Sequence, residues 1–397
     1  IAINNDSFEP NIKKKNGTSF IFELASLAHN APDSYKEKAF QRLEKAINND
    51  SFDSYIKDQH GTPFIFELAS LDRHAPDSYK EKAFQLLEKA INNESFNPNI
   101  KDKDGTPFIS ALTSLATFGT HKEKAFQLLE KAIKNESFDP FIKNSYGTPF
   151  IFELAFLVQN AADTYKEKAC QLLEKAIKNE SFNPNIKDSY GTLFIFKLAS
   201  LAHHAPDSYK EKAFQLLEKA IKNESFDPFI KNKYGTPFIF ELASLATFDT
   251  HKEEIFQLLE KAINNDSFDP YIKDQHGTPF IFELAFLAQN AADTYKEKAF
   301  QLLEKAINND SFDPYIKDQH GTPFIFELAS LAQDASDTHK EKAFQLVVKA
   351  INNDSFNSYI KDSNEELFLF KLISLAQDAS DTYKEKAFQL LEIAINN

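Results

Sequence analysis

The feature that most constrains this chain is an internal repeat with a period of 44 or 42 residues. A Gly-Thr step marks the register, with spacings of 44, 44, 42, 44, 44, 42, 44 and 44 residues up to Glu365 in the ninth register. Such periods are typical of arrays that grow along one axis, because each unit buries its apolar face only against its neighbours. The 397 residues therefore predict nine stacked units rather than two or three ordinary domains.

The repeat boundaries follow from this register. Repeats three and six are the short ones and alone share Ala-Thr-Phe, at 116–118 and 246–248, which indicates a duplicated unit of three repeats. Residues 1–6 match the tail of a repeat, and the chain begins with Ile, so we expect a fragment of a longer protein whose array could continue. Residues 7–397 are predicted to form a single array, with repeats at 7–50, 51–94, 95–136, 137–180, 181–224, 225–266, 267–310, 311–354 and 355–397.

Each repeat has the pattern of two helices and an extended turn. In residues 51–94, Thr62-Pro63 is predicted to open the first helix, with Pro at its first position and Thr as its cap. The segment 64–71 is almost wholly apolar, which predicts a helix buried on most sides. Ser78 and Glu81 have the spacing of a capping box, and the amphipathic pattern after them predicts a solvated outer helix.

Phenylalanine supports the predicted stack. Of the 40 Phe residues, 34 fall in four columns that recur once per repeat, where rings can pack across repeat interfaces. Ser110 interrupts one column and Cys170 interrupts another. We interpret these columns as core, and Cys170 as a small buried hydrophobe rather than a nucleophile.

The segment 97–108 (Asn-Pro-Asn-Ile-Lys-Asp-Lys-Asp-Gly-Thr-Pro-Phe) resembles the ankyrin turn and the Thr-Pro-Leu start of its helix, and Leu86-Leu87 is similar to the leucines of the second ankyrin helix. This repeat is about ten residues longer than the ankyrin repeat and lacks the His of its motif. The resemblance implies an all-α, right-handed α-solenoid of nine helix-turn-helix repeats. It also implies a concave binding surface of inner helices and turn tips, a protein partner and no enzyme activity.

Composition excludes several classes of partner. A net charge of −14 and a pI near 5.3 oppose binding to nucleic acid or to anionic lipid. One cysteine excludes internal disulfides, and no apolar run approaches the ~20 residues needed to cross a bilayer, so we expect a cytoplasmic protein. Ankyrin-like arrays are common among proteins that intracellular bacteria deliver into hosts, which suggests an effector acting in the host cytosol.

Sequence motifs for catalysis, cofactors or metals are not found. The glycines stand singly before Thr rather than in a phosphate loop, and no His-Glu-x-x-His or Gly-x-Ser-x-Gly pattern occurs. His121, His251 and His339 stand where other repeats have Tyr, which favours a packing role. His29 and His74 could approach each other, but no carboxylate or thiol has the spacing of a third ligand.

Three columns of residues are candidates for partner binding. A polar column on the first helix would line one face and attract a basic segment, or would simply be a solvated edge: Glu23, Glu67, Glu153, Glu241, Glu283 and Glu327, with Ala111, Lys197 and Lys371 in the other repeats. The residue before each Gly varies between fixed neighbours, which suits either a turn tip that contacts a partner or neutral drift at an exposed position: Asn16, His60, Asp104, Tyr146, Tyr190, Tyr234, His276, His320 and Asn364. A third column mixes Asn with aromatics, which would either anchor an interface or, as we favour, pack under the turn: Asn11, Tyr55, Asn99, Phe141, Asn185, Phe229, Tyr271, Tyr315 and Tyr359.

These patterns favour a non-catalytic scaffold that binds a protein partner. An alternative is the targeting or regulatory arm of a larger multidomain enzyme whose catalytic part lies outside this fragment. A third hypothesis is a spacer that oligomerises through uncapped ends. In the ninth repeat, Glu365-Glu366-Leu367 replaces Gly-Thr-Pro, which is consistent with a C-terminal cap.

Overall fold

The computed structural model describes residues 9–396, apart from 16, 75–76, 93–95, 206, 249–251, 266–267, 310–311 and 354–355, and apart from the side chains of 33, 72–74, 77, 207–208 and 248. The regular elements in these residues are α-helices, and isolated β-bridges close the turns. The helices are α1 (Phe20–Asn30), α2 (Asp33–Ile47), α3 (Phe64–His74), α4 (Asp77–Ile91), α5 (Phe108–Phe118), α6 (Lys122–Ile133), α7 (Phe150–Asn160), α8 (Asp163–Ile177), α9 (Phe194–His204), α10 (Asp207–Ile221), α11 (Phe238–Phe248), α12 (Lys252–Ile263), α13 (Phe280–Asn290), α14 (Asp293–Ile307), α15 (Phe324–Asp334), α16 (Asp337–Ile351), α17 (Phe368–Asp378) and α18 (Asp381–Asn396).

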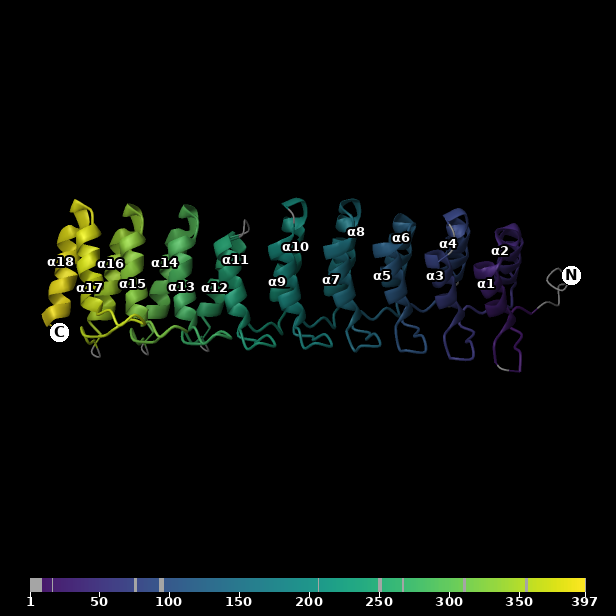
Figure 1. The fold of residues 1–397 in the computed structure, drawn as a ribbon, viewed down its shortest axis with the longest axis horizontal. Coiled ribbons are helices and arrows are strands. Elements are labelled where there is room, and N and C mark those ends of the chain that lie inside the picture. The colour runs from purple at the N-terminus through teal and green to yellow at the C-terminus, as the bar shows by residue number, and fades with distance from the viewer. Residues whose placement is uncertain are drawn as a thin grey trace. The chain divides into compact units, whose positions relative to one another are not determined.

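The helices pair as the repeat pattern predicts. The chain divides into two compact units, Ile1–Ser225 with α1–α10 and Phe226–Asn397 with α11–α18. Within each unit, the odd-numbered helix of a repeat packs on the even-numbered helix that follows it. Each odd-numbered helix also packs on its counterpart in the next repeat of the unit, and so do even-numbered helices such as α6 on α8 and α14 on α16. The turns of a unit lie together at one end of its helix pairs (Figure 1). The predicted all-α class, built of repeated helix pairs, is confirmed for the residues that the structure describes.

The start of the first helix differs from the prediction. In the third repeat the helix begins at Phe108, and Pro107 precedes it in an extended conformation (φ −68°, ψ 148°) without a side-chain cap. Pro107 forms an antiparallel bridge with Lys101, and the bridge recurs in every repeat. The fixed φ of proline suits this extended residue as well as a first helical position. Proline therefore helps to close the turn, and the predicted Thr cap is wrong.

The predicted capping box of the second helix is also wrong. The second helix of this repeat type begins at Asp, one residue before the predicted cap, as at Asp77 of α4 and Asp163 of α8. In α8 the residue before the helix is Ala162, which offers no side-chain cap. Glu81 accepts hydrogen bonds from Lys124 and Gln85 instead. The negative charge of this first Asp interacts favourably with the positive, N-terminal end of the helix dipole. This electrostatic interaction stabilises the start of the helix.

Phenylalanine packing across repeats forms the core of each unit. Phe64 is fully buried and meets Phe22 of the preceding repeat edge-to-face at 5.0 Å and Phe52 of its own turn at 5.9 Å between ring centroids. The same two contacts recur around Phe108 and Phe194. Edge-to-face pairs add stabilisation beyond the buried area. The interpretation of the phenylalanine columns as core is confirmed for these rings, whereas Phe370 and Phe388 of the ninth repeat are each 56% exposed.

The residues that depart from these columns also pack. Cys170 is buried, and this burial raises the pKa of its thiol to about 11, which keeps it protonated and unreactive at neutral pH. The His339 ring stacks on Phe300 at 5.4 Å and 9°, as Tyr165 stacks on Phe126 at 5.2 Å and 7°. His121 contacts Phe84 at 5.5 Å in a tilted arrangement, whereas His251 lies outside the described residues. The predicted packing role is confirmed for His121 and His339.

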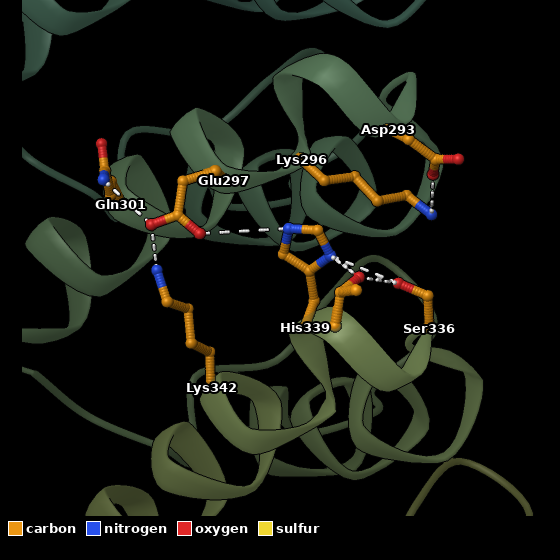
Figure 2. Close-up of polar contacts among 8 residues, drawn as sticks. Asp293, Lys296, Glu297, Gln301, Ser336, His339 and Lys342 are labelled. Carbon is orange, nitrogen blue, oxygen red and sulfur yellow. Dashed lines mark hydrogen bonds and ion pairs between the residues drawn. The ribbon is translucent and has the colours of Figure 1, made fainter.

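The outer helices are joined by ion pairs between successive repeats. Lys89 lies 2.8 Å from Glu44, and Lys175 lies 2.8 Å from Glu130, each pair separated by 45 residues. A second set of pairs lies nearer the start of the outer helices, and Figure 2 shows one of them, Lys342 with Glu297, beside the His339 ring. Exposed pairs of this kind contribute little each, about 0–1 kcal/mol. Their main effect is to fix the position of each outer helix along its neighbour.

The third column joins the turns of adjacent repeats. The Asn185 side-chain amide donates to the Ser225 carbonyl at 2.7 Å, and Asn99 makes the same contact to Ser137. Where the column has Tyr271, its hydroxyl oxygen accepts the backbone N–H of Asp313. Asn and Tyr therefore provide alternative hydrogen bonds to the next turn. Phe229 instead packs on Phe268 of the next turn at 6.4 Å between ring centroids, whereas Tyr359 is 72% exposed, so the expected packing under the turn holds for these residues but not for Tyr359.

Replacing Tyr271 by Phe should lower the stability of the second unit by about 1 kcal/mol, because the Asp313 N–H loses its acceptor while the ring stays in place. Urea unfolding would measure the loss. Tyr295→Phe is a matched control, since Tyr295 stacks on Phe256 and its packing is kept by the substitution. Equal losses for the two variants would contradict the role assigned to the Tyr271 hydroxyl.

Candidate functional site

In the turn tips of the second to ninth repeats, one side chain accepts hydrogen bonds from two backbone N–H groups. Asp188 accepts the backbone N–H groups of Tyr190 at 2.9 Å and Thr192 at 2.8 Å through the same carboxylate oxygen. Gly191, between them, has φ +78°, a left-handed conformation that glycine adopts without strain. Asn144 makes both contacts in the preceding repeat, so Asp and Asn are equivalent here. The turn is thus closed without the histidine of the ankyrin motif.

The residues predicted at the tips are exposed. Tyr146 and Tyr190 are 81% and 79% exposed, and Tyr234 is 65% exposed. His60, His276 and His320 are also exposed, and each ring nitrogen lies within about 3 Å of the preceding Gln side chain. Asn16 lies outside the described residues. The prediction that the variable residues stand at exposed tips is correct for these six.

Neighbouring tips are linked to each other. In the first unit, the Thr148 hydroxyl donates to the Ser189 hydroxyl at 2.9 Å, joining the turn that carries Tyr146 to the turn that carries Tyr190. Thr322 and Ser363 make the same link in the second unit at 3.0 Å. Successive tips are therefore fixed relative to each other, as well as within each turn.

The glutamate column is less exposed than a solvated edge. Glu23 is exposed and forms an ion pair with Lys14 at 2.8 Å, whereas Glu67, Glu153, Glu241, Glu283 and Glu327 are half-buried. Burial raises the pKa of the carboxyls of Glu67, Glu153 and Glu327, and it raises the pKa of Glu283 to about 7 with help from the nearby Asp274. The column is thus not a uniform stripe of ionised carboxylates. Half-burial limits the long-range attraction that the sequence suggested for it.

Glu283 makes the second unit sensitive to pH. Its pKa is about 7 in the folded chain and 4.5 in the unfolded chain, so its favourable contribution is complete below pH 4.5 and is lost as the pH rises to about 7. This shift corresponds to roughly 3 kcal/mol before solvent screening of the half-buried side chain is allowed for, so we expect Glu283→Gln to be at least about 1 kcal/mol more stable than the parent at pH 8 and to match it at pH 4. Thermal unfolding at the two pH values tests this. Glu23→Gln, which removes an exposed paired carboxylate, should show no gain at pH 8.

A groove lies on the seam between α5 and α7, where the phenylalanine column is interrupted by Ser110. It holds about 330 Å³ and lies on the sides of α5 and α7 that carry the polar column. Among the residues that line it are Ser110, Thr113, Thr117 and Phe118 from α5, and Phe152, Glu153 and Phe156 from α7. We call it the Ser110 groove.

The walls of the Ser110 groove are mainly apolar. The Thr113 and Thr117 hydroxyls donate to the carbonyls of Ile109 at 3.1 Å and of Thr113 at 2.8 Å, so these hydroxyls are satisfied within α5. Phe118 and Phe156 are 67% and 45% exposed. Sequence reasoning recorded the interruption at Ser110 but missed the groove, and that interruption was the signal that could have found it.

The described residues hold no group of three or more His, Cys, Asp or Glu side chains arranged to bind a metal ion. The predicted proximity of His29 and His74 involves the His74 side chain, which lies outside the described residues. Among the helices as described, none is both long and apolar enough to cross a membrane.

The sequence matches no protein-family model and no curated protein. Among solved structures, the chain is similar to the crystal structure of the ankyrin repeat protein EF0377, with 13% sequence identity and a TM-score of 0.33. The similarity covers 62% of this chain and 96% of that chain. The ankyrin-like description of the fold rests on the helix pairs and bridged turns of the chain itself.

Proposed function

We propose that this chain is a non-catalytic scaffold that binds a protein partner through its turn tips and through the exposed side of its odd-numbered helices. The observation that carries the proposal is the pair of tyrosines at adjacent tips of the first unit, Tyr146 and Tyr190, which are 81% and 79% exposed. Tyrosine combines a large apolar ring with a polar hydroxyl, and it is among the residues that dominate binding energy at interfaces.

The rigidity of the tips supports the same function. Asn144 and Asp188 fix the backbones of the two turns, and Thr148 links one turn to the next. A binding surface that is already ordered loses less conformational entropy when a partner binds. The two tyrosines are therefore presented at a fixed spacing, as anchors for a partner that spans more than one repeat.

The proposed partner is a protein with a basic segment, as the sequence predicts. A net charge of −14 makes a partner with a basic segment the best electrostatic match. The effector role, the host-cytosol location and oligomerisation through the ends of the array stay predictions from the sequence.

Replacing both Tyr146 and Tyr190 by Ala should reduce partner recovery at least tenfold, because two anchors are lost, while thermal stability stays within about 0.5 kcal/mol of the parent. Affinity capture with cross-linking and quantitative mass spectrometry would measure recovery. Lys175→Ala, on the outer helix α8, is the control and should leave recovery unchanged. Undiminished recovery with the double variant would exclude these tips as the binding surface.

A further inference from the structure

The Ser110 groove exists because one ring is missing from a repeating pattern. At the corresponding position Phe66 meets Phe108 at 5.3 Å, and Phe240 meets Phe280 at 5.1 Å, both edge-to-face. At position 110 the chain has Ser, whose hydroxyl donates to Glu153 at 3.0 Å and leaves the space of a ring open.

The sixth repeat is a natural comparison for the third. Both repeats have the short connection between their helices, and Thr247 and Phe286 stand where Thr117 and Phe156 stand. Thr247 is buried and donates to the Ala243 carbonyl at 3.0 Å, as Thr117 donates to its own helix. The sixth repeat keeps its ring at Phe240. A phenylalanine at position 110 would therefore restore an arrangement that the chain already uses.

Glu153 gives the groove its chemical character. One oxygen of its carboxylate accepts both of the hydrogen bonds it receives, from Ser110 at 3.0 Å and from the Asn144 side chain at 3.1 Å. Among the described residues, Glu153 forms no ion pair, whereas Glu23 in the same column pairs with Lys14. Burial without a cation raises the pKa of the Glu153 carboxyl. A cation from a partner, placed beside this carboxylate, would stabilise its ionised form and offset the free-energy cost of burying it.

We propose that the Ser110 groove binds a lysine or arginine side chain from a basic segment of the partner protein. The methylene stem of such a side chain would lie against the threonines and phenyl rings of the groove, and its charged end would meet the Glu153 carboxylate. The faces of Phe118 and Phe156 would also attract the cation. This inference rests on the proposed function, since it names the partner chemistry at one point of the same surface.

The carboxylate decides between a basic occupant and an apolar one. An aromatic or aliphatic side chain would fill the space of the missing ring, but it would seal Glu153 from water without a positive charge. Sealed from water without a cation, Glu153 would have to take up a proton, and the free-energy cost of this protonation at neutral pH offsets part of the gain from apolar contact. A lysine or arginine side chain satisfies the apolar walls and the carboxylate together.

A random dodecapeptide library displayed on phage tests the proposal without a known partner. The library is selected on the intact chain in the presence of excess soluble Ser110→Phe variant, so that peptides binding elsewhere are removed. We expect peptides with Lys or Arg at one fixed position. The synthetic peptide should bind at least tenfold more weakly to Ser110→Phe, and about tenfold more weakly when that Lys or Arg is replaced by norleucine.

Two further variants show whether weaker peptide binding comes from loss of the groove or from unfolding of the chain. Glu153→Gln keeps the shape of the side chain and should weaken the same peptide about tenfold, whereas Glu304→Gln on the outer helix α14 should not weaken it. Circular dichroism of Ser110→Phe should match the parent. A selected consensus of aromatic or aliphatic residues, or equal affinity of the norleucine peptide, would overturn the basic occupant.

The outcomes also distinguish this proposal from the proposed function. Peptides that bind the parent and the Ser110→Phe variant equally would reject the groove and leave the scaffold function in place. A library that yields no binder to the parent chain under any condition would reject both.

Discussion

Replacing Phe194 by Ala should lower the stability of the first unit by about 3–5 kcal/mol, the range for losing a fully buried phenylalanine. Phe194 is completely buried and meets Phe152 of the preceding repeat at 5.1 Å and Phe182 of its own turn at 6.0 Å. Since repeats are stabilised by their neighbours, the cavity should uncouple the fifth repeat from the fourth. Urea unfolding would measure the loss.

Hydrogen exchange would locate the Phe194→Ala effect. The amides of α9 and α10 should exchange faster in the variant, while those of α3 and α4 should stay close to the parent. Phe156→Ala is the matched control, because Phe156 is 45% exposed and its truncation should cost less than about 1 kcal/mol. A uniform acceleration across the whole unit would mean that the repeats unfold as one block, against the expectation of local coupling.

Replacing Asp188 by Ala should have the next largest effect, about 2 kcal/mol. The substitution removes the acceptor for the N–H groups of Tyr190 and Thr192, and the Thr192 turn is half-buried, so water replaces these bonds poorly. The expected result is a lower thermal midpoint and a Tyr190 tip that is no longer ordered.

Asp188→Asn is the control for this prediction. Asn144 and Asn232 already occupy the equivalent position and accept the same pair of N–H groups, at 3.0 and 3.1 Å for Asn144. The Asn variant should therefore stay within about 0.5 kcal/mol of the parent. Loss of stability in Asp188→Asn equal to that in Asp188→Ala would show that charge, rather than hydrogen bonding, holds the turn.

Periodicity alone predicted most of the fold. The phenylalanine columns identified the core because burial of a large ring at every repeat leaves few arrangements, and Phe64 and Phe194 lie where the pattern placed them. Helix starts were less predictable. Ser78 and Glu81 have the spacing of a capping box, yet Glu81 bonds to Lys124 of the next repeat, a competitor that only the stacked structure brings near.

The candidate site was predicted in part. Tyr146 and Tyr190 could be recognised as tip residues because they precede a glycine between constant neighbours. The burial of Glu153 and Glu283 could not be read from the sequence, since it depends on how closely adjacent odd-numbered helices approach. A sequence pattern shows which residues share a column, but it does not show how much solvent each column retains.

The ion pairs between outer helices have a consequence for how such a chain can change over generations. Within a repeat, α8 offers Lys175 to the repeat before it and Glu174 to the repeat after it, where Lys219 pairs with Glu174. This repeat thus presents a lysine to one neighbour and a glutamate to the other, and Lys89 with Glu44 forms the same pair between the first two repeats. Repeats that match in this way can be gained or lost by recombination without creating a mismatched seam, so array length can evolve separately from the contacts that hold the array together.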